Sequence, residues 1–190
     1  MKNIKITHIK FVTMVLAFGS FFTLFAQHET HASKTTGDST KKSIPREVHA
    51  QMGKLHTMIF YHSPAVRGRT IWGGLVPYGE VWVTGAHNAT LWEFNEAIEI
   101  NNTKVEAGKY AIFTIPGKEK WIFILNKKWK QHLADEYDTK EDVLRVEVKP
   151  ETVLNAQERL SYTLEQQSKF KGVLSIQWEH VRLTIPFQVK

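Results

Sequence analysis

Short runs in which apolar and polar residues alternate recur along most of the chain, about every ten residues, and they predict strands. Residues 142–148 alternate cleanly, which is typical of a half-exposed strand, and residues 159–166 follow the same pattern. Strands are also predicted over residues 80–84 and 89–95. A long amphipathic helical period cannot be found in the sequence, so the pattern indicates an all-β protein.

Three other runs, residues 54–62, 110–115 and 121–125, are apolar on both parities. A strand of this kind belongs in a sheet that is covered on both faces. Pro116 and Gly117 mark a turn between the last two runs. We therefore expect these two strands to be adjacent and to form the centre of the core.

Turn residues divide the chain between the strands. Asn101 and Asn102 separate the short runs 97–100 and 103–105, and Asn tolerates the positive φ angles that a two-residue hairpin turn requires. This segment therefore predicts a hairpin. Residues 126–137 are the least strand-like part, and we expect either one short helix or a long loop there.

The inward-facing parity changes once near the C-terminus. Apolar residues occupy even positions over 174–178 and odd positions over 181–187, so a tight turn or a bulge is expected at Glu179 and His180. About nine short strands with turn signals between them predict an antiparallel β-sandwich or a partly closed barrel. The fold should also contain a long Gly/Pro-rich loop and at most one short helix.

Three lysines near the N-terminus precede an apolar run, residues 11–26, that is short for a membrane span. This pattern predicts a secretory signal peptide, and an uncleaved membrane anchor is the alternative. The residues that follow are polar and poor in aliphatic side chains, as in a disordered linker. We therefore expect an exported protein, periplasmic or secreted, with no membrane span after cleavage. Its parts would be a signal peptide (1–26), a polar linker (27–46) and a single β domain (47–190).

Composition excludes several classes of site. The chain has no Cys, so disulfides and thiolate metal ligands are excluded. Without residues 1–26 the Lys and Arg total falls from 25 to 22 against 19 acidic residues, and the formal net charge falls from +6 to +3. Charges of both signs are interspersed, which argues against nucleic acid as a partner.

Residues 61–94 concentrate Gly, Pro, Trp, Arg and His, the composition of ordered loops that carry binding sites. In an extended segment Arg67 and Arg69 would point to the same side, about 7 Å apart, and clamp a carboxylate, sulfate or phosphate. In the alternative interpretation Glu80, Glu93 or backbone carbonyls engage the two arginines and hold the loop on the sheet. We expect a cleft for a polar, anionic or sugar-like ligand, lined by Arg67, Arg69, Trp72, Trp82, Thr84, His87 and Asn88.

Five of the six Trp residues divide into two groups. Trp121 and Trp178 lie in strongly apolar runs and are expected in the core, whereas Trp72, Trp82 and Trp92 are candidates to line a groove.

The sequence gives little support for a metal site or for a serine nucleophile. The spacing of His62, His87, His132 and His180 does not predict a metal site, and no cofactor is expected. Ser63 precedes Pro64 and lacks the elbow on which hydrolases expose a nucleophile.

A series of short motifs carries a resemblance to a known family. In order, they are Ser63-Pro64, Val66-Arg67-Gly68-Arg69, Ile71-Trp72-Gly73, Leu75-Val76-Pro77-Tyr78-Gly79, Val81-Trp82, Thr84-Gly85-Ala86, Ala107-Gly108-Lys109-Tyr110 and Phe113-Thr114-Ile115-Pro116-Gly117. With these motifs the chain resembles the exported bacterial family called domain of unknown function 2911. The resemblance implies an exported single-domain protein and brings no established activity. The chain departs from the family pattern at Val83, where an Arg is expected, and at His87, where an Asn is expected.

Two classes of function remain open from the sequence. The first is a non-enzymatic binding or envelope-interaction module for a small polar or carbohydrate-like ligand or an envelope component. The second is a hydrolase-like enzyme that uses His87 as general base. The lack of a paired carboxylate or a nucleophile motif favours the first.

Overall fold

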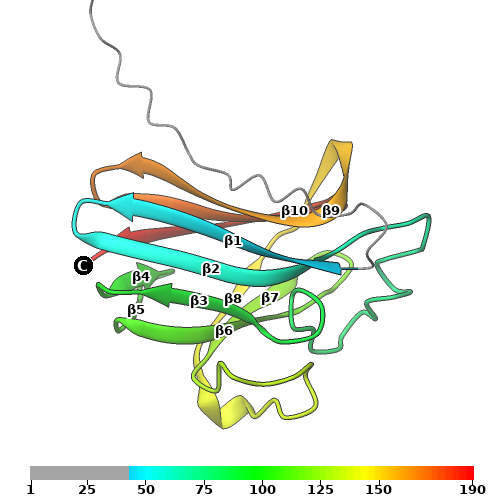
Figure 1. Cartoon of the computed structure of the whole chain (residues 1–190), viewed down its shortest axis with the longest axis horizontal. Helices are drawn as coiled ribbons and strands as arrows, with labels where there is room; N and C mark the ends of the chain where they lie inside the picture. The colour runs from blue at the N-terminus through cyan, green and yellow to red at the C-terminus, as the bar shows by residue number, and fades with distance from the viewer. Residues whose placement is uncertain (1–42) are drawn as a thin grey trace, which may run out of the picture. The chain divides into compact units, whose positions relative to one another are not determined.

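Two antiparallel sheets face each other in the computed structural model, which describes residues 43–190 (Figure 1). The larger sheet has the strand order β1 (Ser43–Met52), β2 (Leu55–Pro64), β3 (Thr90–Phe94), β6 (Gly108–Ile115), β7 (Trp121–Asn126) and β8 (Asp142–Val148). The smaller sheet has the order β5 (Thr103–Val105), β4 (Ile98–Ile100), β10 (Lys171–Val189) and β9 (Glu151–Ser168). The predicted antiparallel β-sandwich is confirmed, and the sheets are not closed into a barrel.

The first strand begins earlier than the sequence pattern predicted. Residues 43–46 were assigned to the polar linker, but they are the start of β1, where Ser43 lies opposite Pro64. The linker assignment is wrong for these residues because Ile44, at 5% exposure, anchors an apolar face that the polar neighbours hide in the sequence. The predicted signal peptide and the linker before residue 43 lie outside the described residues.

The main core fills the space between the sheets. Trp92 and Phe94 of the larger sheet and Leu174 and Trp178 of the smaller sheet are all at most 2% exposed. Burial on this scale is the dominant favourable term in folding. Within residues 43–190 no helix is long and apolar enough to cross a membrane.

Strands β6 and β7 carry a second apolar layer on their outer face. Phe113 and Ile124 lie opposite each other and have 0% exposure. They pack against Val83 and Ala89, and Tyr137 packs on the same cluster. The prediction that these two strands are adjacent and covered on both faces is therefore confirmed.

Strand β2 differs from this pattern. Its Leu55 and Ile59 are fully buried, whereas Met58 and Phe60 on the other face are half-buried. The prediction that both faces are covered is thus only partly right for this strand, since the second apolar layer lies over β6 and β7.

The predicted hairpin is confirmed: β4 and β5 are joined by Asn101 and Asn102, which have φ angles of 47° and 62°. Residues 80–84, by contrast, were predicted as a strand but form only one isolated bridge, between Trp82 and Thr114. Strand β7 is followed by a long loop, residues 127–138, as one of the two predictions for this segment had it. The loop ends in one short 3₁₀ turn, Thr139–Glu141.

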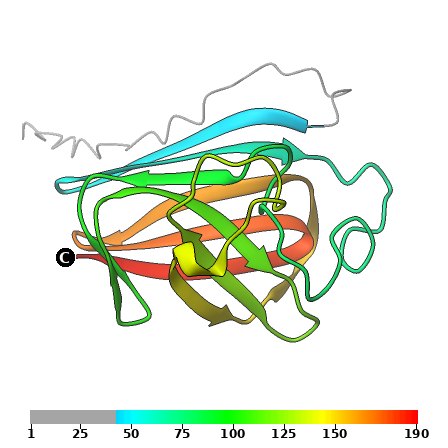
Figure 2. The ribbon, with the colours of Figure 1, turned by 90° about the horizontal axis from the view of Figure 1, so that it is seen from below.

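The strand β10 turns back on itself at Glu179, whose φ is 53°, with register shifts on both sides of this residue. The Val189 N–H donates to the Phe170 carbonyl at 2.8 Å, and Figure 2 shows the C-terminus next to the β9–β10 turn. The predicted turn or bulge at residues 179–180 is confirmed. It explains the parity change, because both arms of β10 direct their apolar side chains into the same core.

Candidate binding site

Four indole rings meet at one end of the sandwich. The Trp72 ring centroid lies 5.7 Å from that of Trp82, 4.8 Å from that of Trp121 and 5.8 Å from that of Trp178, with steep interplanar angles. Trp82 stacks on Trp178 at 5.7 Å. As predicted, Trp121 and Trp178 belong to the core, at 3% and 1% exposure, whereas Trp72 and Trp82 are half-buried.

Trp92, a predicted candidate for the groove, is instead fully buried, and its indole N–H donates to the Thr57 hydroxyl at 2.7 Å. Its strand lies in the middle of the larger sheet, so this side chain has no access to the surface.

A pocket of about 400 Å³ opens beside the Trp cluster. We call it the tryptophan pocket. Its walls come from the Gly-rich loop, the β6–β7 turn, the β8–β9 link and the turn within β10, and its lining residues are Trp72, Tyr78, Gly117, Lys118, Glu119, Trp121, Lys149, Pro150, Glu151, Thr152 and Val181. Figures 1 and 2 place the Gly-rich loop at the end of the sandwich opposite the C-terminus.

Local backbone contacts hold the Gly-rich loop in shape. Ile71 and Val76 are buried, and the Val76 N–H donates to the Ile71 carbonyl at 2.9 Å. Gly73 has a φ of 78°, and a Cβ at this position would lie 2.8 Å from Cε2 of the Tyr78 ring. The Gly79 N–H donates to Pro116 at 2.8 Å and so ties the loop to the β6–β7 turn. The aromatic wall of the pocket is therefore built on an ordered loop.

The charged rim of the pocket is balanced. Lys118 and Lys149 line it together with Glu119 and Glu151. The Thr184 hydroxyl donates to the Glu151 carboxylate at 3.3 Å, which orients that side chain. The pocket thus combines an apolar aromatic wall with positively and negatively charged side chains that can form hydrogen bonds.

The two arginines of the predicted clamp lie on a tight turn, not on an extended segment. Arg67 and Gly68 have φ angles of 52° and 68°, and the Arg69 N–H donates to the Val66 carbonyl at 3.1 Å. The Arg69 guanidinium donates to the carbonyls of Ala65 and Val66 at 2.5 and 3.1 Å. The expected extended segment is wrong, because the positive φ angles of residues 67 and 68 form a turn.

Neither predicted carboxylate partner, Glu80 or Glu93, pairs with these arginines among residues 43–190. Glu93 pairs with Lys109 at 3.2 Å, and the carboxylate that reaches the loop is that of Glu158, which accepts from the Arg67 backbone N–H at 3.0 Å. The alternative interpretation is right about Arg69, since backbone carbonyls engage its guanidinium and hold the loop. The acidic partners that it named do not supply this contact.

This arrangement predicts different costs for the two arginines. The variant Arg69→Gln should lower the free energy of unfolding by about 1 kcal/mol, because two hydrogen bonds to carbonyls are lost. The variant Arg67→Gln should change it by less than about 0.5 kcal/mol. Urea denaturation measures both values, and equal costs for the two variants would contradict the assigned role of Arg69.

Thr84 is fully buried, with a φ of 50°. Its hydroxyl lies 3.0 Å from that of Thr114, and its carbonyl accepts from the hydroxyls of Tyr162 and Thr90 at 2.6 and 3.0 Å. This residue joins the loop to both sheets, and its side chain does not reach the tryptophan pocket.

His87 and Asn88 are exposed and lie away from the lining of the tryptophan pocket. The His87 Nε2 lies 2.6 Å from the Ser43 hydroxyl, and the Asn88 Oδ1 lies 3.3 Å from His132 Nδ1. Of the seven predicted binding residues, Trp72 lines the tryptophan pocket and Trp82 packs against it. The sequence gives no local sign of the remaining lining residues, because four distant segments contribute them.

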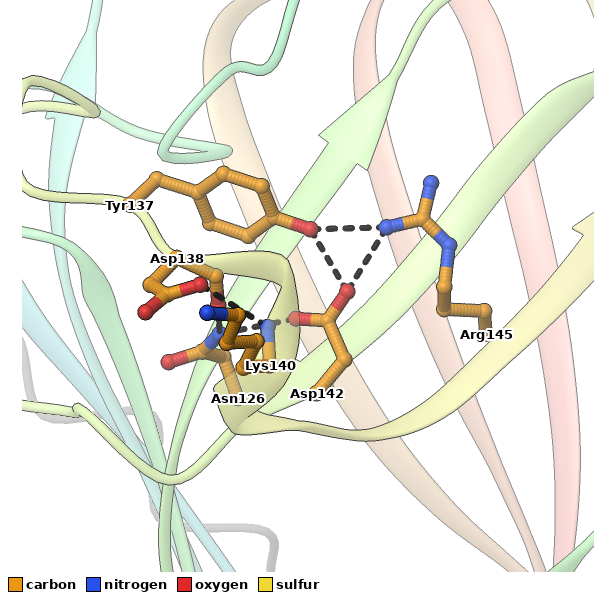
Figure 3. Close-up of polar contacts among 6 residues, drawn as sticks. All are labelled: Asn126, Tyr137, Asp138, Lys140, Asp142 and Arg145. Carbon is orange, nitrogen blue, oxygen red and sulfur yellow. Dashed lines mark hydrogen bonds and ion pairs between the residues drawn. The ribbon is translucent and has the colours of Figure 1, made fainter.

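A hydrogen-bonded network closes the loop that covers Phe113 (Figure 3). The Tyr137 hydroxyl donates to Asp142 Oδ2 at 2.6 Å, and Arg145 Nη1 donates to both groups at 2.7 and 2.6 Å. Asn126 donates to Asp142 Oδ1 at 2.7 Å. Burial, and then the hydrogen bond to Asp142, raise the pKa of Tyr137 to about 12. The phenol therefore stays protonated at neutral pH, which suits a structural donor and not a catalytic base.

Comparison with known proteins identifies a family without an assigned activity. A family model described as "Protein of unknown function (DUF2911)" matches residues 43–187. No curated protein and no solved structure matches the chain.

Proposed function

The chain belongs to the family DUF2911, which brings no activity, and from the site itself we propose an exported, non-enzymatic binding module for a carbohydrate-like ligand. The proposed site is the tryptophan pocket. The observation that carries this proposal is that one pocket of about 400 Å³ combines the rings of Trp72, Tyr78 and Trp121 with polar groups on its rim.

The chemistry of the pocket supports a sugar ring. Aromatic side chains present a large apolar surface of fixed geometry, which suits the C–H face of a pyranose. Ligand sites typically combine such a surface with a few placed polar groups that give orientation. On the rim, the charges of Lys118 and Lys149 are opposed by those of Glu119 and Glu151, which suits hydroxyl groups better than a strongly charged ligand.

Intrinsic fluorescence titration tests this proposal, because two of the six Trp residues line the pocket. Cellohexaose, an oligogalacturonate and a chitosan hexamer serve as neutral, acidic and cationic probes of similar size. We expect saturable changes with the neutral probe, because the charges on the rim are balanced. Saturation with a charged probe alone would contradict this preference for a neutral sugar, and saturation with none of the three would count against a carbohydrate-like ligand.

A second candidate function, a hydrolase-like enzyme, is favoured by one observation. The Ser43 hydroxyl lies 2.6 Å from His87 Nε2, within reach for proton transfer from a nucleophile to a base. Among residues 43–190 no carboxylate contacts the other ring nitrogen of His87, so a third orienting group is missing from this part of the chain. If this function is correct, p-nitrophenyl acetate is hydrolysed by the protein and not by Ser43→Ala; equal rates would exclude it.

A further inference from the structure

Two histidines that are far apart in the sequence meet on the outer face of the larger sheet. His62 comes from β2 and His87 from the loop before β3, and their ring centroids are 5.2 Å apart at an interplanar angle of 86°. The Nδ1 atom of His62 is buried and has no hydrogen-bond partner among residues 43–190. A buried ring nitrogen without a partner is costly unless it serves a purpose.

The backbone holds the two histidines together. The Ala86 N–H donates to the His62 carbonyl at 3.2 Å, and the Leu133 N–H donates to the His87 carbonyl at 2.7 Å. The φ of His87 is 64°, a conformation that L-residues rarely adopt and that persists only where the surroundings enforce it. The loop is thus fixed from both sides with its imidazole beside His62.

We propose that His62 and His87 form a two-histidine site for a divalent transition-metal ion, such as Zn²⁺ or Cu²⁺. Neutral imidazole is a common ligand for these ions, with metal–nitrogen distances of about 2.0–2.1 Å. The exposed ring of His87 can exchange its hydrogen bond to Ser43 for the ion, whereas the half-buried ring of His62 is the more enclosed partner.

The remaining coordination positions would be taken by water or by the hydroxyl of Ser43, which already lies beside His87. Among residues 43–190 no group of three or more His, Cys, Asp or Glu side chains surrounds this place, so the site has two protein nitrogens and open positions. A two-ligand site favours Cu²⁺ over Zn²⁺ at equal concentration, following the general order of affinity for divalent metals.

Metal binding by the full mature chain, measured by competition with a chromophoric chelator for Cu²⁺ and Zn²⁺, tests the proposal. We expect His62→Ala and His87→Ala each to weaken the tightest site at least tenfold, and the double variant to weaken it little further, because one ligand alone does not chelate. Two histidines elsewhere, His49 and His180, serve as matched controls, and their Ala variants should bind as the parent does. Parental affinity in the His87→Ala variant would overturn the proposal.

Paramagnetic broadening by Cu²⁺ in the parent protein gives a second measurement that does not depend on the folding of any variant. The imidazole signals of His62 and His87 should broaden together at substoichiometric Cu²⁺, before that of His180. The Ser43→Ala variant should retain this broadening, which separates the metal site from the hydrolase candidate. Broadening of His87 without His62 would show a single surface imidazole and would overturn the two-histidine site.

Discussion

Replacement of Phe113 by Ala is expected to lower the free energy of unfolding by about 3–5 kcal/mol, the usual cost of removing a large aromatic side chain from a packed core. Phe113 is fully buried in β6 and lies opposite Ile124 of β7. Its ring centroid is 5.0 Å from that of Tyr137. The cavity would therefore open between the sheet and the loop that covers it, and both the sheet and the loop would lose packing contacts.

Urea denaturation followed by far-ultraviolet circular dichroism measures this cost. The matched control is Leu154→Ala, since Leu154 is 97% exposed and its truncation should change the free energy of unfolding by less than about 0.5 kcal/mol. If Phe113→Ala is as stable as the control, the second apolar layer over β6 and β7 does not exist as described.

Replacement of Tyr78 by Ala is expected to weaken binding of the neutral oligosaccharide about tenfold or more, which corresponds to about 1.4 kcal/mol. Tyr78 lines the tryptophan pocket and is 40% exposed, so its ring is available for stacking. It contacts Gly73 in its own loop and lies outside both apolar core clusters, so the fold should tolerate the change.

The matched control for this variant is Phe170→Ala. Phe170 is an aromatic residue at 56% exposure in the β9–β10 turn, away from the pocket lining. Equal binding by the Tyr78 variant and the control would remove the tryptophan pocket from consideration, whereas a selective loss in the Tyr78 variant supports it.

Much of the fold could be predicted from the sequence because strand periodicity and turn residues act locally. The doubly apolar runs of β6 and β7, the Asn101-Asn102 hairpin and the parity change at Glu179 each specify a structure through neighbouring residues. The start of β1 escaped prediction because one strand face of small and polar residues resembles a linker.

The site was harder to predict because it depends on contacts between distant segments. The sequence pattern predicts one extended segment at Arg67 and Arg69, but the positive φ of Arg67 and Gly68 makes a turn there. The polar side chain of Thr84 suggests a surface position, but its hydroxyl is satisfied in the interior by the Thr114 hydroxyl and the Trp82 carbonyl.

The tryptophan pocket was also hard to predict, because segments that are distant in the sequence form it. Trp72 meets Trp121 and Trp178 from segments about 50 and 100 residues farther along the chain. Sequence spacing carries no signal for such a meeting.

The most direct measurement for the central claim is a ¹H–¹⁵N correlation spectrum of the protein titrated with the neutral oligosaccharide. The indole N–H signals of Trp72 and Trp121 should shift with saturation, whereas that of Trp92, which is buried and bonded to Thr57, should not. If the shifts instead cluster at the backbone signals of Arg67, His87 and Asn88 and leave both indoles unchanged, the ligand binds at the loop cleft expected from the sequence, and the assignment of the tryptophan pocket is contradicted.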